Sequence, residues 1–348
     1  MLSKDPDKPE DGWISGPRIH EFMQEMHREV FASRPPGLLT VGETPATPVE
    51  QAVLYTDPAR GEVDMVFQFE HVDLDSGPGG KWDIVPMTML DLKRSLNRWQ
   101  EGLAEVGWNS LYLGNHDQPR CVTRFGNDAP EHREQSAKAL ATVLHLHRGT
   151  PYVYQGDELG LPNAGFSRID QLRDVESLNQ YASAVAAGQD PAEVMAALRA
   201  KSRDNARLPM PWDGSPSGGF TTGTPWIEVH PLAATINAEA QVGDPDSVFA
   251  HFQRLIALRH DEPVVGHGTF RMLLADDPQV YAFLRELDGS RLLVVANLSD
   301  AAGVVADLSE AGTWGAAELA IGSVAGSSPA PTDPMAPWES RVYRLTAG

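Results

Sequence analysis

The 348-residue chain is long enough for about two domains of ordinary size, and its 41% hydrophobic and 22% charged residues are typical of a folded globular protein. Its formal net charge of -20 argues against nucleic acid and anionic membranes as partners, because binding to phosphate groups needs clustered Lys and Arg. The single cysteine, Cys121, excludes an internal disulfide. With no apolar leader and no apolar run of ~20 residues, we expect a cytoplasmic protein.

Four short apolar runs in the first half of the chain each end abruptly in polar residues, which predicts buried strands. They are 38–41, 63–69, 110–113 and 151–154. The segments 18–32, 88–103 and 131–148 between them are predicted helices. Strands that alternate with helices indicate a parallel sheet with right-handed crossovers. Ligands of such sheets bind at the carboxyl ends of the strands, where these polar residues fall.

The pattern changes after Tyr154. Residues 157–215 resemble an insertion with a helix at 191–201, the Pro- and Gly-rich run that follows is a loop, and 246–260 is a predicted helix. Short strands with turn signals between them then predict a small antiparallel β-sandwich domain. These strands are 270–274, 280–285, 291–298, 304–308, 316–321 and 340–345. We expect domains at 1–262 and 263–348.

Two polar clusters at the predicted strand ends carry candidate chemistry. One is Asn115-His116-Asp117-Gln118-Pro119-Arg120, and the other places Glu43 after the strand that ends at Val41. Taken alone, the first is equally typical of a loop held by Asn and Asp turn hydrogen bonds. A lone Glu such as Glu43 is more often a solvated surface residue.

The combination of the two clusters is more informative than either alone. Two carboxylates on different strand ends of one parallel sheet can flank a single bond. Glycoside hydrolysis needs such a pair: one group protonates the leaving oxygen and another stabilises or attacks the oxocarbenium-like carbon. A carboxylic acid held between apolar walls can keep its proton near neutral pH and act as the general acid.

Several segments resemble motifs of the α-amylase superfamily (glycoside hydrolase family thirteen). Val41-Gly42-Glu43-Thr44-Pro45 is similar to its fifth-strand motif, and Asn115-His116-Asp117-Gln118-Pro119-Arg120 to its seventh-strand motif. Three further segments resemble the oligo-1,6-glucosidase and α-glucosidase subfamily: VFQFEHVDLDSGPGGKW at 66–82, GTPYVYQGDELG at 149–160 and RDNARLPMPWD at 203–213. The resemblance covers nearly the whole chain.

The resemblance implies a role for each candidate residue. Glu43 is the general acid/base, Asp117 stabilises the transition state, and His116 binds the sugar nearest the cleaved bond. Arg207, or else Arg203, reaches the substrate; the alternative for both is an ion pair within a loop. Phe69 and Glu70 line the pocket wall or serve in packing. No cofactor and no metal ligand set is implied.

One element of the family pattern does not occur in the 348 residues. The family nucleophile is an Asp on the fourth strand, within a Gly-Phe-Arg-x-Asp motif that this sequence lacks. In relatives, a stretch like Ser3-Lys-Asp-Pro6 closely follows that motif, so we expect a chain truncated at its N-terminus. Asp5, Asp7, Glu10 and Asp11 lie in a Pro-rich stretch and cannot replace a nucleophile at a strand end.

The resulting prediction is an α/β fold comprising strands five to eight of a (β/α)8 barrel, followed by the β domain. The expected function is retaining hydrolysis of terminal α-glucosidic bonds in oligosaccharides or disaccharides, impaired because the nucleophile is absent. The alternatives are a transglycosylating isomerase relative and a non-catalytic carbohydrate-binding remnant or accessory protein. Retention of Glu43, His116, Asp117 and Arg207 argues against the non-catalytic alternatives.

Overall fold

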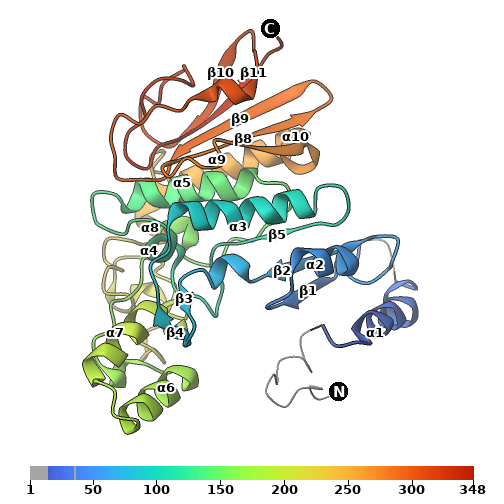
Figure 1. The fold of residues 1–348 in the computed structure, drawn as a ribbon. Helices are drawn as coiled ribbons and strands as arrows, with labels where there is room; N and C mark the ends of the chain where they lie inside the picture. The colour runs from blue at the N-terminus through green and yellow to red at the C-terminus, as the bar shows by residue number, and fades with distance from the viewer. Residues whose placement is uncertain (1–14, 35–36) are drawn as a thin grey trace.

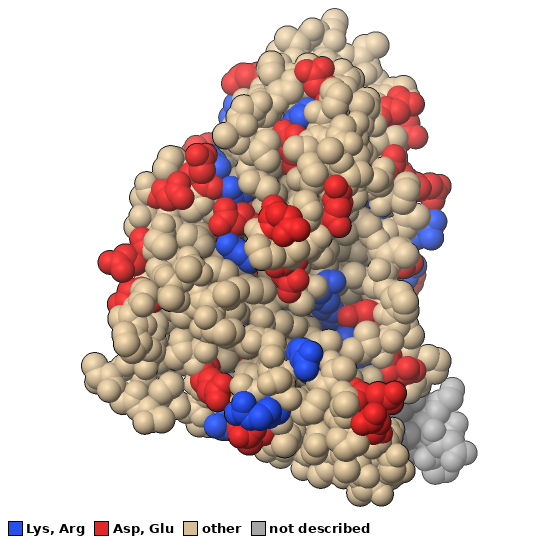
Figure 2. Space-filling view, turned by 90° about the vertical axis from the view of Figure 1, so that its left-hand side faces the viewer, with Lys and Arg blue, Asp and Glu red and all other residues tan. Residues whose placement is uncertain are grey.

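The computed structural model describes residues 15–34 and 37–348. A layer of helices lies between the C-terminal β sheet on one side and the N-terminal strands and a smaller helical region on the other (Figure 1). None of the helices in the described ranges is long and apolar enough to cross a membrane. Acidic side chains are spread over most of the face shown in Figure 2, and basic ones lie among them.

The predicted parallel strands form in the predicted order. They are β1 (Val41–Thr44), β2 (Met65–Gln68), β5 (Ser110–Leu111) and β6 (Thr150–Pro151). β1 pairs with β2 and β5 with β6, both in parallel, and a parallel bridge between Val66 and Asn109 joins the two pairs. The carboxyl ends of β1, β2, β5 and β6 therefore share one edge. This is the arrangement that half of a (β/α)8 barrel requires.

Helices connect these strands and cover them. The first predicted helix, at 18–32, is observed as α1 (Ile19–Met26), which continues into the π-helical turn η2 (His27–Phe31). The predicted helix at 88–103 is α3 (Met89–Gly102), whose N-cap residue Thr88 forms a capping box with Asp91. The predicted helix at 131–148 is α5 (Arg133–Leu146), which is buried on nearly every side because it lies between the parallel strands and the β domain.

Further short elements surround the strand ends. They are α2 (Val49–Thr56), η3 (Glu70–Val72), the antiparallel hairpin β3 (Ser76–Gly77) and β4 (Gly80–Ile84), α4 (Cys121–Phe125), η4 (Asp157–Leu159), η5 (Ile169–Gln171), α6 (Val175–Ala186), α7 (Pro191–Lys201), η6 (Arg203–Asn205), η7 (Pro216–Gly219) and α8 (Ala238–Gln241). α6 and α7 pack on each other at the end of the molecule opposite the β domain (Figure 1). The helix predicted at 191–201 is confirmed at those bounds as α7.

The C-terminal region forms one five-stranded antiparallel sheet in the order β10-β11-β9-β8-β7. Its strands are β7 (Thr269–Leu273), β8 (Val280–Leu287), β9 (Ser290–Asn297), β10 (Ala317–Gly322) and β11 (Ser340–Leu345), preceded by α9 (Val248–Asp261) and α10 (Pro263–His267). The strand predicted at 304–308 was wrong. Val304 makes only an isolated bridge to Met335, and the chain then turns into η8 (Leu308–Ala311).

Both faces of this sheet are buried. Alternate side chains such as Tyr281, Phe283 and Val294 pack on α5 and α9 within the main core. The intervening ones, such as Ala282 and Val295, pack under the long connections that carry Ala306 and Met335. Those connections take the place that a second sheet has in a sandwich.

Candidate active site

Glu43 lies within β1 rather than after it, because the strand begins at Val41. Its register partner on β2 is Phe67, so the two side chains lie on the same face of the sheet. Phe67 contacts the rings of Tyr112 and Tyr152 on that face, with centroids 5.3 and 4.6 Å away. Burial raises the pKa of Tyr112, and the negative charges of Asp73 and Glu43 raise it further. Glu43 therefore faces the aromatic side of the parallel strands.

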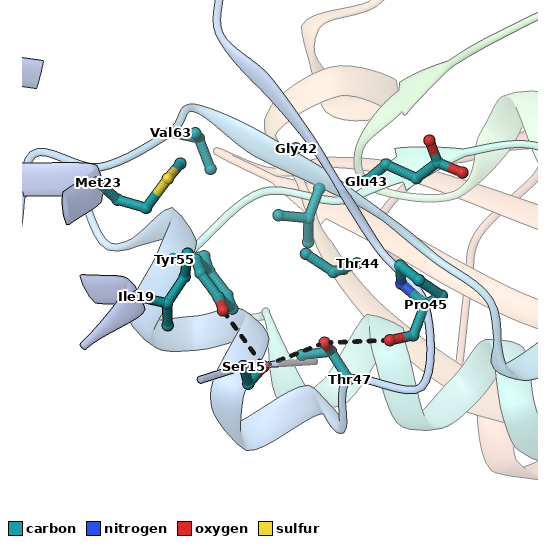
Figure 3. A pocket seen from close by; sticks show the side chains of 11 residues that line it. Ser15, Ile19, Met23, Gly42, Glu43, Thr44, Pro45, Thr47, Tyr55 and Val63 are labelled. Atoms are coloured by element: carbon teal, nitrogen blue, oxygen red, sulfur yellow. Dashed lines mark hydrogen bonds between the residues drawn. The ribbon is translucent and has the colours of Figure 1, made fainter. Parts of the chain in front are cut away.

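The face of β1 opposite to these aromatic rings borders a pocket. This pocket of about 260 Å³ lies between β1, α1 and α2, and Ile19, Met23 and Tyr55 contribute to its wall (Figure 3). The Ser15 hydroxyl closes one side through hydrogen bonds with Tyr55 at 3.2 Å and Thr47 at 3.4 Å. In Figure 3 the Glu43 carboxylate is directed away from these apolar side chains. The pocket is also lined by Gly42, Glu43, Thr44 and Pro45, so it reaches the carboxyl end of β1.

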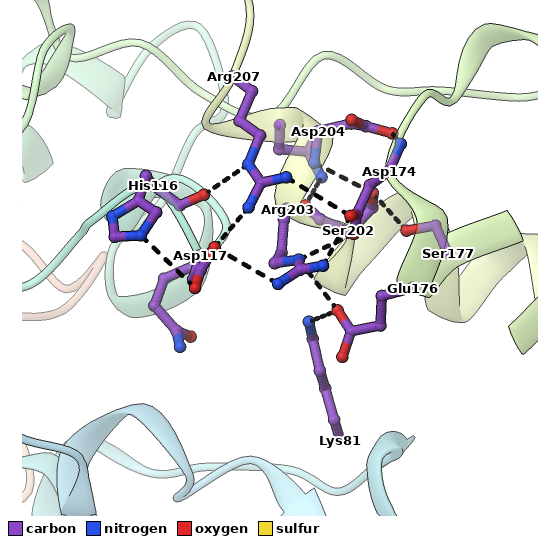
Figure 4. Close-up of polar contacts among 12 residues, drawn as sticks. Lys81, His116, Asp117, Asp174, Glu176, Ser177, Ser202, Arg203, Asp204 and Arg207 are labelled. Carbon is purple, nitrogen blue, oxygen red and sulfur yellow. Dashed lines mark hydrogen bonds and ion pairs between the residues drawn. The ribbon is translucent and has the colours of Figure 1, made fainter. Parts of the chain in front are cut away.

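Asp117 lies in the loop after β5, at the centre of a charged cluster (Figure 4). Arg207 donates from Nη2 to Asp117 Oδ1 at 2.5 Å, and Arg203 Nη1 lies 3.6 Å from the same oxygen. His116 Nε2 lies 3.6 Å from Asp117 Oδ2, and the His116 carbonyl accepts from Arg207 Nε at 2.9 Å. The backbone N–H of Asp117 donates to Asn115 Oδ1 at 2.8 Å. The structure thus brings four predicted site residues together.

Asp174, at the start of α6, contacts the guanidinium groups of both Arg203 and Arg207. Arg203 donates to its two carboxylate oxygens at 2.9 and 2.7 Å, and Arg207 Nη1 lies 3.4 Å from Oδ1. Burial alone would raise the pKa of Asp174, but the hydrogen bonds and charge of Arg203 and the charge of Arg207 lower it overall. The hydrogen bond to Asp174 raises the pKa of Arg203. Asp174 therefore stays ionised and fixes both guanidinium groups.

The cluster extends to residues that the sequence did not single out. Glu176 Oε2 lies 3.3 Å from Arg203 Nε and accepts from Lys81 Nζ at 2.6 Å. Lys81 belongs to the β3–β4 hairpin, 95 positions away from Glu176 in the chain. Asp174 and Glu176 were missed because they follow an ordinary loop, with no motif and no apolar strand before them. An acidic pair opening a helix is the one local signal that was available.

Phe69 and Glu70 occupy different surroundings. Phe69 is half-buried against the main core, with its ring centroid 6.2 Å from that of Tyr112. Glu70 is turned toward α3, where its carboxylate accepts from Arg98 at 2.7 Å and from Trp99 Nε1 at 3.0 Å. The structure therefore joins Glu70 to the covering helix and not to the cluster around Asp117.

Buried groups beneath the strand ends hold the loops in place. Arg120, within the predicted motif, donates to the carbonyls of Gln155 at 2.5 Å and Asn205 at 3.0 Å, which connects the loop after β5 to the loop after β6 and to η6. Burial is the main cause that raises the pKa of Asp157 to about 6. Among residues 15–34 and 37–348, no three His, Cys, Asp or Glu side chains are grouped to hold a metal ion.

The arrangement has the elements of a glycosidase site. Glu43 and Asp117 belong to strand ends that only β2 separates, and they share the carboxyl edge of the sheet. The Glu43 carboxylate lies on the exposed strand β1. The Asp117 carboxylate is surrounded by guanidinium and imidazole groups, which can donate hydrogen bonds to sugar hydroxyl groups. Such an edge can hold a neutral polyhydroxyl ligand between an acid and an ionised carboxylate.

Comparisons with known proteins agree with this geometry. Residues 2–268 match the family model "Alpha amylase, catalytic domain", and residues 270–324 match "Maltogenic Amylase, C-terminal domain". An oligo-1,6-glucosidase of Parageobacillus thermoglucosidasius is 46% identical over 99% of this chain and 64% of its own length. A trehalose-6-phosphate hydrolase of Bacillus subtilis (strain 168) is 43% identical over 99% of this chain and 63% of its own.

Solved structures give the same result. The crystal structure of a Bacillus licheniformis trehalose-6-phosphate hydrolase superimposes with a TM-score of 0.91 at 40% identity, covering 98% of this chain and 62% of that one. A trehalulose synthase superimposes with a TM-score of 0.90 at 37% identity, with the same coverage. The chain thus spans a little under two thirds of the length of these relatives. The family resemblance and the fold predicted from the sequence are confirmed, and the chain belongs to the α-amylase family.

Proposed function

We propose that this chain supplies the acid and the transition-state carboxylate of a retaining glycoside hydrolase that acts on terminal α-glucosidic bonds. The substrates would be oligosaccharides or disaccharides. The observation that carries the proposal is the placement of Glu43 and of the Asp117 cluster at one edge of the parallel sheet. Membership of the α-amylase family supports it further.

Each residue then has a chemical role. Glu43 donates its proton to the oxygen of the leaving group as the bond to the anomeric carbon breaks. Asp117 stabilises the positive charge that develops on the sugar ring. His116 and Arg207 donate hydrogen bonds to the hydroxyl groups of the same sugar. Arg203 holds Asp117 from the other side and contributes to the same subsite. Phe69 contributes apolar surface below the sugar, and Glu70 supports the pocket through α3.

The catalytic nucleophile is the part that the 348 residues do not provide. Retaining hydrolysis needs a second carboxylate to form the glycosyl-enzyme intermediate, and Gly-Phe-Arg-x-Asp is absent from the sequence. We therefore propose that this chain by itself turns over glucosides slowly or not at all. Loss of a nucleophile from such a constellation typically costs on the order of 10⁴-fold or more in rate.

A small external anion tests the proposal directly. Azide added with phenyl α-glucoside should attack the anomeric carbon from the face opposite the leaving group and form β-glucosyl azide. The bond from C1 to the phenolic oxygen breaks as the C1–N bond forms, and Glu43 supplies the proton that phenol carries away. Chromatography of the products measures β-glucosyl azide against a blank without protein.

Variants then separate the roles. Glu43→Gln should slow azide-dependent release of phenol about 100-fold or more, yet slow release of 4-nitrophenol much less, because that better leaving group needs little protonation. Glu50→Gln, an exposed change on α2, is the matched control and should leave both rates unchanged. Asp117→Asn should abolish glucose binding measured by calorimetry. Azide products that are equal with and without Glu43 would contradict the proposal.

Two wider statements belong to the same proposal. We place the catalytic part at 1–262 and the β domain at 263–348; α9 ends at Asp261, just before this division, and the antiparallel strands begin at Thr269, after α10. We place the protein in the cytoplasm, which the single cysteine supports. Fractionation of the native host with an antibody against the chain would test the location.

A further inference from the structure

Three buried charged residues outside the Asp117 cluster form an ion-pair triad, and none of them has a role in the reaction proposed above. Asp75 lies between η3 and β3, Arg124 in α4, and Lys201 at the last position of α7. Arg124 donates to both oxygens of Asp75, at 3.1 Å from Nε to Oδ2, and Lys201 Nζ donates to Oδ1 at 2.5 Å. The three side chains are 13%, 4% and 3% exposed, so the triad joins three segments of the chain where little solvent reaches.

Each cation of the triad is connected to one side of the Asp117 cluster. Arg124 Nη1 donates to Gln118 Oε1 at 2.6 Å, and Gln118 follows Asp117 directly in the chain. Lys201 stands two positions before Arg203. Asp117 Oδ1 and Arg203 Nη1 lie 3.6 Å apart. The triad therefore connects the two segments that meet in this contact.

The carboxylate of Asp75 keeps the two cations of the triad close together. Burial alone would raise the pKa of Asp75, but the hydrogen bonds and charges of Arg124 and Lys201 lower it overall, so the carboxylate is ionised at neutral pH. Burial lowers the pKa of Lys201, and the positive charge of Arg124 lowers it further. Two like charges repel strongly where little solvent screens them. Without Asp75 we therefore expect α4 and the end of α7 to separate.

We propose that Asp75 is a positioning residue for the reaction assigned above. By holding the two cations of the triad together, it fixes the position of Asp117 relative to Arg203. The inference rests on the proposed function, because this position matters for the chemistry only if Asp117 stabilises the charge on the sugar ring. Displacing such a group by about 1 Å can cost on the order of 100-fold in rate.

Azide-dependent release of 4-nitrophenol from 4-nitrophenyl α-glucoside measures the effect, because this leaving group needs little protonation by Glu43. Asp75→Asn should lower the rate at saturating glucoside about tenfold or more. The double variant Asp75→Asn/Lys201→Met lacks the repulsion between the cations, so urea denaturation should find it more stable than Asp75→Asn. Its rate should remain about tenfold low, because α4 and α7 are still not joined. A merely structural role predicts instead that the rate recovers together with the stability.

Glu339→Gln is the matched control. Glu339 forms a buried ion pair with Arg341 in the β domain, at 2.6 Å, and both side chains are 3% exposed. This variant should lose stability, because the buried guanidinium loses its charged partner. It should keep the full rate of the reaction with azide, because the pair lies outside the segments that carry the Asp117 cluster.

Crystal structures of the wild-type chain and of both Asp75 variants measure the positioning whether or not the chain is active. The distance from Asp117 Oδ1 to Arg203 Nη1, 3.6 Å in the wild type, should lengthen by about 1 Å or more in both variants. An unchanged distance, a rate that recovers in the double variant, or an equal loss of rate in Glu339→Gln would overturn the inference. If the wild-type chain forms no β-glucosyl azide while the distance lengthens in the variants, the placement of Asp117 by Asp75 stands and the proposed function fails.

Discussion

At the scale of single residues, the Asp117 cluster is a balanced set of charges. Three carboxylates, from Asp117, Asp174 and Glu176, alternate with three cations, from Arg203, Arg207 and Lys81. Only the Asp174 carboxylate is almost fully buried, with 1% of its side chain exposed. It therefore organises the cluster, since the arginines at its two oxygens can adopt few other positions.

Replacing Asp174 tests this organising role. Asp174→Asn leaves Arg203 and Arg207 without their buried partner, so the free energy of unfolding at pH 7 should fall by about 2–4 kcal/mol. Urea denaturation measures the change. Asp170→Asn, at an exposed ion pair with Arg168, is the control and should have little effect.

The pH dependence of the same variant follows from the lowered pKa of Asp174. A carboxyl whose pKa is lower in the folded state stabilises the fold above its unfolded pKa of about 4, and that stabilisation is lost as the pH falls through the folded pKa. Wild-type and Asp174→Asn curves should therefore converge as the pH drops below about 4. A constant gap down to pH 2 would contradict this reading.

Glu70 gives the opposite test, because it is a site candidate that the structure joins to α3. Glu70→Ala removes the acceptor of the buried Trp99 N–H, so the free energy of unfolding should fall by about 1–2 kcal/mol. Calorimetry should find glucose affinity unchanged. The exposed change Glu101→Ala on the same helix is the control for stability. A clear loss of affinity in Glu70→Ala would return Glu70 to the sugar site.

At the scale of elements, periodicity and end signals predicted most of the fold. Thr88 marks the start of α3, and Pro191 that of α7, because both provide strong local signals. The segment 304–308 has the composition of a strand, but it covers the sheet as a connection and pairs at one position only. Helices α2 and α6 were missed: α6 buries only Ser177 and Ala184, too little for a clear apolar stripe.

Prediction of the site residues from the sequence was limited in the same way. Glu43 and Asp117 could be found because each stands in a dense local motif beside an apolar strand. Asp174, Glu176 and Lys81 could not, because their importance comes from contacts that only the folded chain creates, such as that between the β3–β4 hairpin and α6. The side on which Glu70 lies depends on the turn after β2, which composition does not specify.

The cap of α3 offers a prediction at this scale. Thr88→Ala removes both side-chain contacts of the capping box with Asp91, so the free energy of unfolding should fall by about 1 kcal/mol. Ser183→Ala, at an exposed position inside α6, should be neutral or slightly stabilising. Chemical denaturation of both variants, with sugar binding as a second measurement, checks it. Equal effects of the two changes would show that the cap contributes nothing.

At the scale of the whole molecule, the helical layer and the β domain share one core. Side chains from α3, α5 and α9 and from β8, β9 and β11 pack in a single cluster. Lys93 on α3 reaches across and donates to the carbonyls of Leu274, Asp277 and Val280. His147 is fully buried, and its Nε2 atom lies 3.1 Å from the hydroxyl oxygen of Tyr281. Burial lowers the pKa of His147 to about 3. We therefore expect both layers to unfold together.

Arg285 on β8 is the sharpest test of this coupling. Its buried guanidinium donates to the carbonyls of Leu146 and Val265 at 2.6 and 2.7 Å, and also to those of Gly268 and Thr269. Arg285→Met leaves these acceptors without a donor, so the free energy of unfolding should fall by about 3 kcal/mol. Because the acceptors belong to both layers, far-ultraviolet circular dichroism and tryptophan fluorescence should report one coincident, shifted transition.

The control is Arg271→Met on the neighbouring strand β7, where the exposed side chain donates to a single carbonyl, that of Glu310. It should barely move the transition. Two separate transitions, with only one displaced by Arg285→Met, would mean that the β domain unfolds on its own. A single transition displaced by Arg285→Met and not by Arg271→Met would instead show that the β domain stabilises the helices behind the strand ends, and through them the edge that carries Glu43 and Asp117.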